Sequence, residues 1–404
     1  MKNPTLARTF RTLGTEGKKG FYTGRIAEAL IEVVQDLGGH LELDDLAHHL
    51  EVGSEPVEAI SLPFRGQGLS ERGGGKRDTA AAAPGPDAGI ELWEHPPNGQ
   101  GIVALMALGI LEELETAGRI PTFGPADHNT APYLHAVVEA LRIAFADASW
   151  YVTDPATTPV PTTGLLARPY LAARARLFDP ERASDLVRHG DPSWASPAQT
   201  ASDTVYLAVG DAAGNAASFI NSNYGGFGTA AVPAGTGFTL QNRGANFSLS
   251  AAHPNAQAPR KRPYHTIIPG LATNLADGSL HSVFGVMGGF MQPQGHVQTL
   301  LGQVVGRLSP QQALDAPRVC IGAGMPEDDG GKPSDRTVYV EEGMDAAAVD
   351  GLRARGHRVE VLRGVARSLF GRGQIIRYTV DEVEGTPVWS AGSDSRGDGA
   401  AYPA

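Results

Sequence analysis

Cysteine is almost absent from this chain, since Cys320 is the only one among its 404 residues. A single thiol cannot form a disulfide within the chain, and its apolar flanks favour a buried structural role. Positive charge is also in deficit, with 33 Lys and Arg against 44 Asp and Glu and a formal net charge of −11. This balance offers no electrostatic basis for binding nucleic acid or an anionic membrane.

Long apolar runs and several common catalytic motifs are missing as well. No stretch reaches the roughly 18 apolar residues of a membrane span, and the start of the chain lacks the apolar core of a secretory signal. We therefore expect a soluble, cytoplasmic protein. The 12 histidines show no His-Glu-x-x-His spacing and no Gly-x-Ser-x-Gly elbow occurs, which argues against a metalloenzyme and a serine hydrolase of the elbow type. We expect no metal and no cofactor.

The composition is that of a globular protein, with 41% hydrophobic and 19% charged residues. In the first half, apolar residues recur at helical spacing in three segments, Phe21 to Leu37, Gly101 to Leu114 and Tyr133 to Ser149. Between Gly66 and Gly89 the chain is dominated by Gly, Ala, Pro and charge, which cannot bury enough surface to offset the entropy of ordering. We predict a disordered insertion there.

Downstream of Ser202 the pattern becomes rich in strands separated by Gly-containing turns. The predicted strands are Val205 to Val209, Ala217 to Ile220, Ser282 to Val286, Thr337 to Glu341, His357 to Leu362 and Gln374 to Val380. Helical pieces are predicted near Pro293 to Val305 and Asp345 to Arg355. This alternation predicts an α+β fold with a layered sheet and helices outside.

Thr204 stands at the start of the first predicted strand of a hairpin, whose turn is Asp211 to Asn215. Taken by itself, a threonine in this place is most often a plain strand former. Its significance depends on the rest of the chain.

Several motifs in order resemble those of the γ-glutamyltransferases, a family of N-terminal-nucleophile hydrolases. Before Thr204 the similar segments are Phe21 to Ala27, His95 to Gly101 and Glu139 to Asp147, and after it they are Gly214-Asn215, Phe227 to Thr229, Lys261 to Pro263 and Gly288-Gly289. The resemblance implies an αββα sandwich. It also implies that residues 1–203 are a large-subunit-like part, N-terminally truncated, and that residues 204–404 are a small-subunit-like part, the two together forming one domain.

The same resemblance implies that the chain cuts itself between Asp203 and Thr204, so that its own two fragments become partners. Thr204 becomes a new N-terminus, and its α-amino group can act as the base for its own hydroxyl. The amides of Gly288 and Gly289 match the family's oxyanion donors, although a simple turn is the alternative. Ser222 aligns with a hydroxyl residue that supports the nucleophile.

The predicted substrate pocket differs from that of the glutathione-cleaving members. Arg243 and Asn246 stand where ligands of the substrate ammonium are usual, His265 and Thr266 replace a pair of serines, and Tyr224 replaces an asparagine. A guanidinium and an amide favour a carboxylate or carbonyl, and the pattern resembles oxamate amidohydrolase and acylase-like members. A structural ion pair for Arg243 and a core position for His265 are the alternatives.

The leading hypothesis is a self-processing amide hydrolase or acyltransferase that acts on γ-glutamyl or glutathione-like substrates through an acyl-enzyme on Thr204. An oxamate amidohydrolase or carboxy-acyl amidase is the second hypothesis. An inactive truncated remnant is the third. In each enzymatic case the partner is a small acidic amide, and neither nucleic acid nor a membrane is expected.

Overall fold

A computed structural model of the protein describes residues 2–69, 89–184, 202–322, 337–381 and 383–403. Most of the predicted disordered insertion, residues 70–88, lies outside the described residues. The chain divides into two compact units. The first comprises residues 1–58 and 222–243, and the second comprises residues 59–221 and 244–404. Each unit thus contains residues from both sides of Thr204.

The first unit is built on three helices, α1 (Pro4–Tyr22), α2 (Gly24–Asp36) and α3 (Leu43–Val52). The predicted helix from Phe21 to Leu37 corresponds mainly to α2, because Thr23 is extended and separates α2 from α1. The segment 222–243 is tied to these helices by hydrogen bonds to backbone carbonyls. Arg25 donates to Gly235 O (2.9 Å), and Thr9 donates to Thr236 O (2.9 Å).

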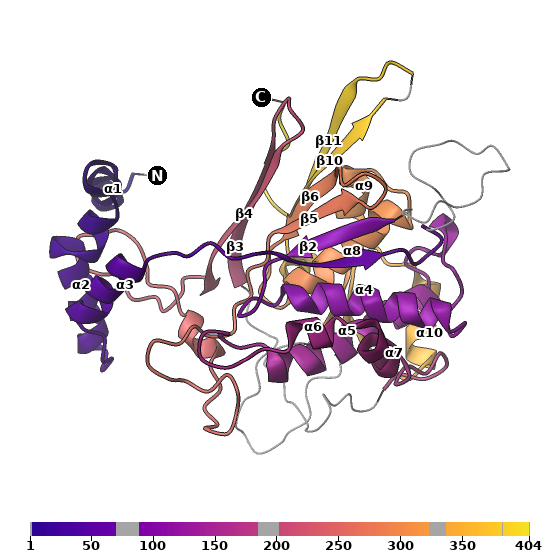
Figure 1. Ribbon diagram of the computed structural model, residues 1–404, viewed down its shortest axis with the longest axis horizontal. Helices are drawn as coiled ribbons and strands as arrows, with labels where there is room; N and C mark the ends of the chain where they lie inside the picture. The colour runs from indigo at the N-terminus through magenta and orange to yellow at the C-terminus, as the bar shows by residue number, and fades with distance from the viewer. Residues whose placement is uncertain (1, 70–88, 185–201, 323–336, 382, 404) are drawn as a thin grey trace. The chain divides into compact units, whose positions relative to one another are not determined.

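The second unit contains a six-stranded antiparallel sheet in the order β1-β2-β5-β6-β10-β11 (Figure 1). Its strands are β1 (Ile60–Phe64), β2 (Ile90–Glu94), β5 (Gly270–Asn274), β6 (Leu280–Val286), β10 (Gly373–Val380) and β11 (Pro387–Ser393). The two short strands β1 and β2 were not predicted from the sequence. They matter because β2, which precedes Thr204, pairs with β5, which follows it.

Helices cover one face of this sheet. These are α4 (Gly101–Thr116) and α8 (Met291–Val304), and α5 (Ala131–Tyr151) packs on α4. All three are close to their predicted bounds. Gly295 of α8 packs directly on Val286 of β6. The remaining elements are α6 (Thr162–Leu165), α7 (Arg168–Ala175), α9 (Pro310–Asp315), α10 (Ala346–Ala354), and a three-stranded sheet of β7 (Val319–Ile321), β8 (Thr337–Glu341) and β9 (Arg358–Leu362).

A hairpin of β3 (Ser202–Gly210) and β4 (Ala216–Gly225) packs on the opposite face, as the sequence predicted a hairpin here. The ring of Tyr206 lies over Gly285, whose neighbour Val286 faces α8. Adjacent residues of a strand point to opposite faces, so the hairpin and α8 lie on different sides of the sheet. Ser218 Oγ fastens β4 by donating to Gly270 O (3.0 Å). This part of the chain is therefore layered as helices, sheet and second sheet.

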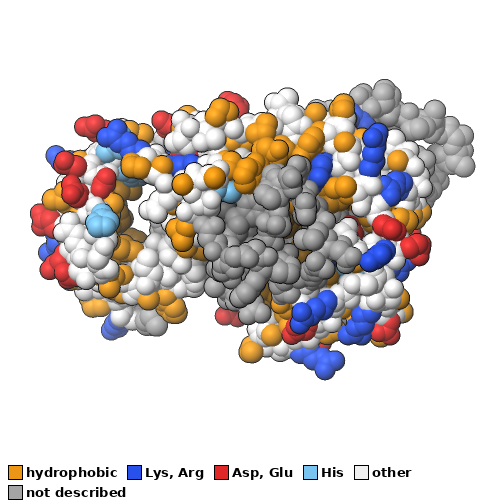
Figure 2. All heavy atoms as spheres, turned by 90° about the horizontal axis from the view of Figure 1, so that it is seen from below, with side chains coloured by type: hydrophobic (Ala, Val, Ile, Leu, Met, Phe, Trp, Pro, Cys, Tyr) orange, Lys and Arg blue, Asp and Glu red, His pale blue; other side chains and the backbone are white. Residues whose placement is uncertain are grey.

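On the face shown in Figure 2, Lys and Arg side chains are interspersed with Asp and Glu side chains. None of the helices in the described ranges combines the length and apolar character that crossing a membrane requires. Cys320 is buried, as expected, and is not in a disulfide. Burial raises the pKa of its thiol to about 12, so the thiol stays protonated at neutral pH.

Candidate functional site

Thr204 lies near the start of β3, and its side chain is fully buried. Two residues further along the strand, Tyr206 is seated on Gly285 of β6. The Tyr206 hydroxyl and Ser218 Oγ are 2.8 Å apart, which fixes the ring from the second strand of the hairpin. The strand that carries Thr204 is thus held firmly against the central sheet.

The far end of the hairpin shows in which direction β3 runs. Gly210, at the carboxyl end of β3, lies against the ring of Trp389. Trp389 of β11 pairs with Tyr378, near the carboxyl end of β10. Because β10 is antiparallel to β6, this end of β10 is remote from the carboxyl end of β6. Thr204, at the other end of β3, therefore lies toward the carboxyl end of β6, where the Gly288–Gly289 turn begins.

The Gly288–Gly289 turn joins β6 to α8. Its glycines have φ values of 123° and 58°, which residues with a side chain rarely adopt. Met287 N donates to Arg372 O (2.9 Å) before the turn, and Met291 N donates to Gly288 O (3.0 Å) after it. Within the described ranges, neither glycine amide donates a hydrogen bond. Two such amides at the N-terminal end of a helix favour an oxygen that carries negative charge.

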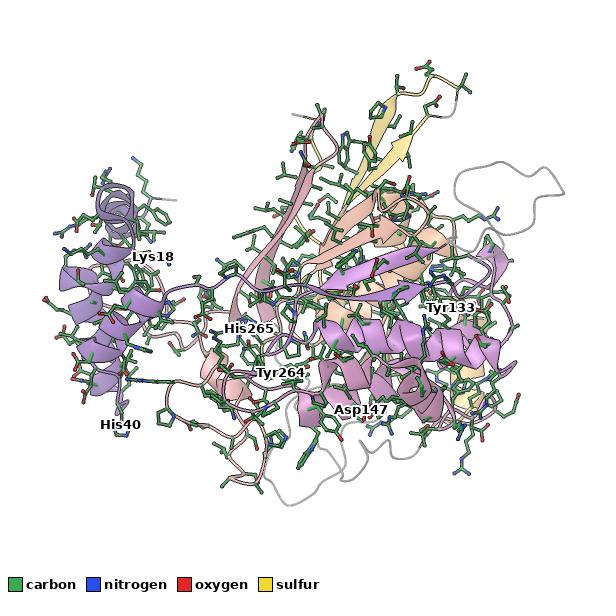
Figure 3. The ribbon with its side chains drawn as sticks, in the orientation of Figure 1. Lys18, His40, Tyr133, Asp147, Tyr264 and His265 are labelled. Carbon is green, nitrogen blue, oxygen red and sulfur yellow. The ribbon has the colours of Figure 1, made fainter. Side chains whose placement is uncertain are left out.

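His265 and Thr266 lie in a segment that crosses the start of α4, with Tyr264 and His265 labelled in Figure 3. The His265 amide donates to Asn98 O (2.8 Å), and its carbonyl accepts from Gln100 N (3.0 Å). The ring Nδ1 accepts from the Ile267 amide (3.2 Å), so a neutral His265 carries its proton on Nε2. Thr266 is fully buried.

Asn246 supports this same segment. It is fully buried, and its Nδ2 donates to Tyr264 O (3.0 Å). Its own carbonyl accepts from Asn255 Nδ2 (2.7 Å), and Asn255 Oδ1 accepts from the Tyr264 amide (3.2 Å). Asn246 Oδ1 is buried and has no hydrogen-bond partner among the described residues. The expected partner of Asn246 was a carboxylate or carbonyl of the substrate, but its donor is already used on Tyr264 O and the group left over is an acceptor.

Three further residues from the sequence analysis, Ser222, Tyr224 and Arg243, meet in the first unit. Ser222 Oγ accepts from the Tyr224 amide (2.9 Å), and the Arg243 guanidinium lies 4.9 Å from the centre of the Tyr224 ring. Tyr224 has a φ of 73°, a costly conformation for a bulky residue and one that is common at functional sites. Burial lowers the pKa of Arg243 to about 10, so it remains a cation at neutral pH.

Gln100 and the pair of Glu94 and His296 were not predicted as site residues, although they lie in or beside the motifs quoted above. Gln100 donates through Nε2 to Thr266 O (2.7 Å) and Gly289 O (2.8 Å). Glu94 Oε1 lies 2.6 Å from His296 Nδ1, with both side chains fully buried. The sequence does not reveal the partners of these side chains, because Gln100 and Thr266 are 166 residues apart and Glu94 and His296 are 202 residues apart.

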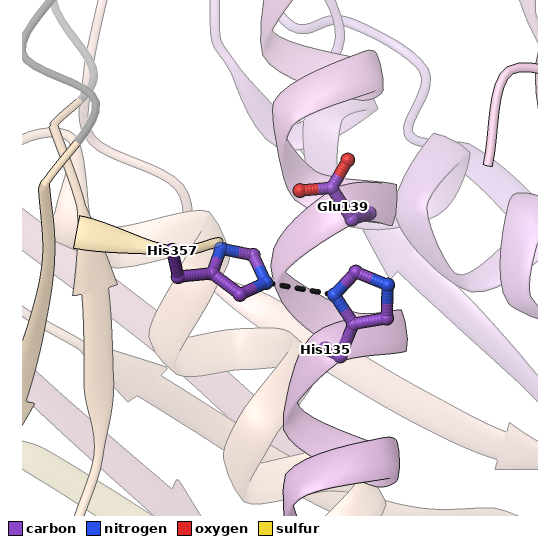
Figure 4. Close-up of side chains that lie close together, drawn as sticks. All are labelled: His135, Glu139 and His357. Atoms are coloured by element: carbon purple, nitrogen blue, oxygen red, sulfur yellow. Dashed lines mark hydrogen bonds between the residues drawn. The ribbon is translucent and has the colours of Figure 1, made fainter. Parts of the chain in front are cut away.

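A cluster in the second unit joins His135 and Glu139 of α5 to His357, which lies 222 residues after His135 (Figure 4). His135 Nε2 lies 2.7 Å from Asp179 O, so this nitrogen carries the proton and His135 Nδ1 accepts from His357 Nε2 (2.7 Å). Arg142 donates to Glu139 (2.7 Å) and to His357 Nδ1 (3.3 Å). Burial lowers the pKa of both histidines. The four ring nitrogens are thus all hydrogen-bonded within a neutral structural chain.

Comparison with known proteins agrees with this architecture. The family model described as gamma-glutamyltranspeptidase matches residues 1–404. The chain belongs to the γ-glutamyltranspeptidase family. It is 32% identical over 396 residues to the glutathione hydrolase-like YwrD proenzyme of Bacillus subtilis, and 32% identical over 403 residues to the oxamate amidohydrolase proenzyme of Klebsiella pneumoniae. These matches cover 98% and 99% of this chain. The chain spans 65% of the length of each of these two relatives.

A solved member of similar fold is the cephalosporin acylase from Bacillus halodurans. It shares 36% identity with this γ-glutamyltranspeptidase-family chain, and the structures superpose with a TM-score of 0.77 over 100% of this chain and 63% of the acylase. The expected family and the mixed α and β fold of N-terminal-nucleophile hydrolases are confirmed. The division at Thr204 and the roles of the individual site residues stay predictions.

Proposed function

We propose that this chain is a self-processing amide hydrolase or acyltransferase of the γ-glutamyltransferase type, with Thr204 as nucleophile. One observation carries the proposal. Strand β3 packs on β6 through the contact between Tyr206 and Gly285. It runs in the direction that brings its amino end, with the buried Thr204, toward the Gly288–Gly289 turn. A hydroxyl nucleophile and a pair of backbone amides that can donate to an oxyanion are the minimal parts of an acyl-transfer site.

Self-cleavage begins when Thr204 Oγ attacks the carbonyl carbon of Asp203. The peptide C–N bond breaks as the C–O bond forms, and the nitrogen that leaves becomes the α-amino group of Thr204. Water then hydrolyses the ester and releases the Asp203 carboxylate. The new amine has a pKa of about 8 in ordinary surroundings, so at neutral pH a usable fraction is an uncharged base beside its own hydroxyl.

Substrate cleavage repeats the same chemistry. The α-amino group takes the proton from Thr204 Oγ as the oxygen attacks the substrate's amide carbon, and it later gives that proton to the departing amine. The Gly288 and Gly289 amides donate to the oxygen that becomes negative in the tetrahedral intermediate. Water, or a second amine, resolves the acyl-enzyme and decides between hydrolysis and transfer. Ser222 is proposed to support the nucleophile.

The substrate class is inferred from the chemistry of the buried polar groups. Arg243 is a desolvated cation stacked on Tyr224, and such a group binds a carboxylate well. Asn246 Oδ1 is a buried acceptor that a substrate N–H would satisfy. His265 Nε2–H and Thr266 supply further polar contacts. We propose γ-glutamyl and glutathione-like amides as the primary class of substrate.

A second candidate is hydrolysis of oxamate or of related carboxy-acyl amides. Arg243 favours it, because a guanidinium offers no anionic partner for the α-ammonium of a γ-glutamyl donor. The relative named oxamate amidohydrolase, 32% identical, is consistent with it. Rates on γ-glutamyl-p-nitroanilide, glutaryl-p-nitroanilide and oxamate separate the candidates, since only the first bears a free α-amino group.

The decisive experiment follows the intact mass of the purified chain and of Thr204→Ala under denaturing conditions. We expect the 42.3 kDa chain to yield two fragments of nearly equal mass that meet between Asp203 and Thr204, and the variant to stay whole and inactive. Thr337→Ala is the matched control, because Thr337 is also a buried threonine at the start of a strand. A folded wild type that stays whole would refute self-processing and favour the inactive remnant.

A further inference from the structure

Gln100 is a buried side chain at the N-terminal end of α4 whose hydrogen bonds all reach distant segments. Its Nε2 donates to Thr266 O (2.7 Å) and to Gly289 O (2.8 Å), and its Oε1 accepts from the Tyr264 hydroxyl (3.1 Å). It makes no side-chain bond to the N-terminus of its own helix. The side chain is fully buried, so water cannot substitute for these partners at low cost.

These bonds join the proposed substrate-binding segment to the proposed oxyanion turn. The Gln100 backbone amide also donates to His265 O (3.0 Å), so main chain and side chain of one residue hold both His265 and Thr266. The same side-chain nitrogen holds Gly289. One amide group thus sets the separation between the carbonyls of Thr266 and Gly289.

The turn needs such a restraint because glycine torsions are soft. On the strand side, Met287 N is bonded to Arg372 O (2.9 Å). On the helix side, Gly289 O accepts from Gln100 and from Gln292 N (3.2 Å). The peptide planes that carry the Gly288 and Gly289 amides lie between these two anchors, and the Gly289 amide plane is also held from the first turn of α8, where Met291 N donates to Gly288 O (3.0 Å). Loss of the Gln100 bond would leave the orientation of Gly289 to the first turn of α8 alone.

We propose that Gln100 is a positioning residue that aims the Gly288 and Gly289 amides and keeps them in register with the 264–266 segment. The inference rests on the proposed function, because it assigns those amides to the oxyanion. Only a side chain with two N–H donors and an acceptor on one planar group meets these three partners. Lys and Arg lack the acceptor for Tyr264, and Glu lacks the donors.

The test is Gln100→Glu, which keeps the shape and the acceptor for Tyr264 but turns two donors into a carboxylate facing two carbonyl oxygens. Misplacing catalytic groups by about 1 Å costs on the order of a hundredfold in rate. We expect kcat for hydrolysis and the rate of self-cleavage to fall by about tenfold to a hundredfold at pH 8, with a smaller change in KM. The activity relative to wild type should recover as pH falls, because a protonated carboxyl regains one donor.

Gln298→Glu is the matched control. Gln298 is also buried, and its Nε2 donates to two carbonyls, Gln294 O and Val319 O (both 2.9 Å), while its Oε1 accepts from Val319 N (2.8 Å). Gln298→Glu therefore makes the same chemical change in the helical layer, because it also turns two donors into a carboxylate that faces two carbonyl oxygens. In the described part of the chain, Gln298 makes no hydrogen bond to the Gly288–Gly289 turn. We expect both variants to lose stability, but only Gln100→Glu to lose kcat with the pH-dependent recovery. Equal kcat losses in the two variants, or no loss in Gln100→Glu, would overturn the positioning role.

A second readout separates this inference from the proposed function. Hydrogen exchange of the peptide 286–292 reports the protected amides of Met291 and Gln292, whether or not the chain is active. We expect faster exchange there in Gln100→Glu than in Gln298→Glu. If the wild type fails to cleave itself, the proposed function fails while this exchange difference still tests the restraint. Unchanged exchange in Gln100→Glu overturns the inference by itself.

Discussion

Substitution of Gly285 by alanine tests the packing that places Thr204. A Cβ at this position would lie 2.8 Å from Cγ of Tyr206 and closer still to two other ring carbons. The ring cannot swing aside easily, because Tyr206 is buried and its hydroxyl is within hydrogen-bond distance of Ser218. Overpacking of this kind costs about 1–3 kcal/mol. We expect the free energy of unfolding to fall by that amount and self-cleavage to slow.

The stability is best measured by urea unfolding in the Thr204→Ala background, where cleavage does not complicate the transition. Gly14→Ala is the control, because a Cβ at Gly14 meets nothing within 4 Å, and a helical Gly to Ala change stabilises by up to about 1 kcal/mol. In a double-mutant cycle, Tyr206→Leu should remove part of the cost, with a coupling of about 0.5–3 kcal/mol. Two results would refute the packing of Tyr206 on Gly285. One is a free energy of unfolding of Gly285→Ala within about 0.5 kcal/mol of its parent. The other is a double-mutant cycle in which the effects of the two substitutions simply add.

The remaining predictions concern the fragments, the substrate and the pH dependence. After cleavage the fragments should co-elute in native gel filtration and separate only in denaturant, because β2 and β5 pair across the cut; separation without denaturant would contradict the shared sheet. Arg243→Lys keeps the charge but loses the planar stack on Tyr224, so KM for an acidic amide should rise about tenfold with kcat little changed, whereas an unchanged KM would assign Arg243 a structural role. Burial lowers the pKa of His357 to about 3, so below about pH 6.5 the unfolded chain binds a proton that the folded chain does not. Stability should therefore fall as pH drops, by about 1 kcal/mol between pH 6.5 and 5.5 from this group. In urea unfolding at pH 7 and 5.5, His357→Gln should show a smaller fall than the parent, and an equal fall would contradict the neutral His135–His357 pair.

Sequence patterns alone identified the elements whose signals are local. Alternating apolar residues and the turn from Asp211 to Asn215 predicted the hairpin that begins near Thr204, and helical spacing predicted α4, α5 and α8. These signals depend on neighbours along the chain, and they survive in the fold. The ordered motifs also identified the family, which the comparisons confirm.

Only the tertiary structure decided which polar groups meet. Gln100 reaches Gly289, and His135 reaches His357, across gaps of 189 and 222 residues. Asn246, expected from the sequence to bind a substrate carboxylate or carbonyl, uses its donor on Tyr264 O and keeps a buried acceptor. The short strands β1 and β2 likewise gain their stability from pairing, β2 with the distant β5 and β1 with β2. Such contacts follow from the strand order and from the layer of each element, and no pattern within a few residues encodes either of them.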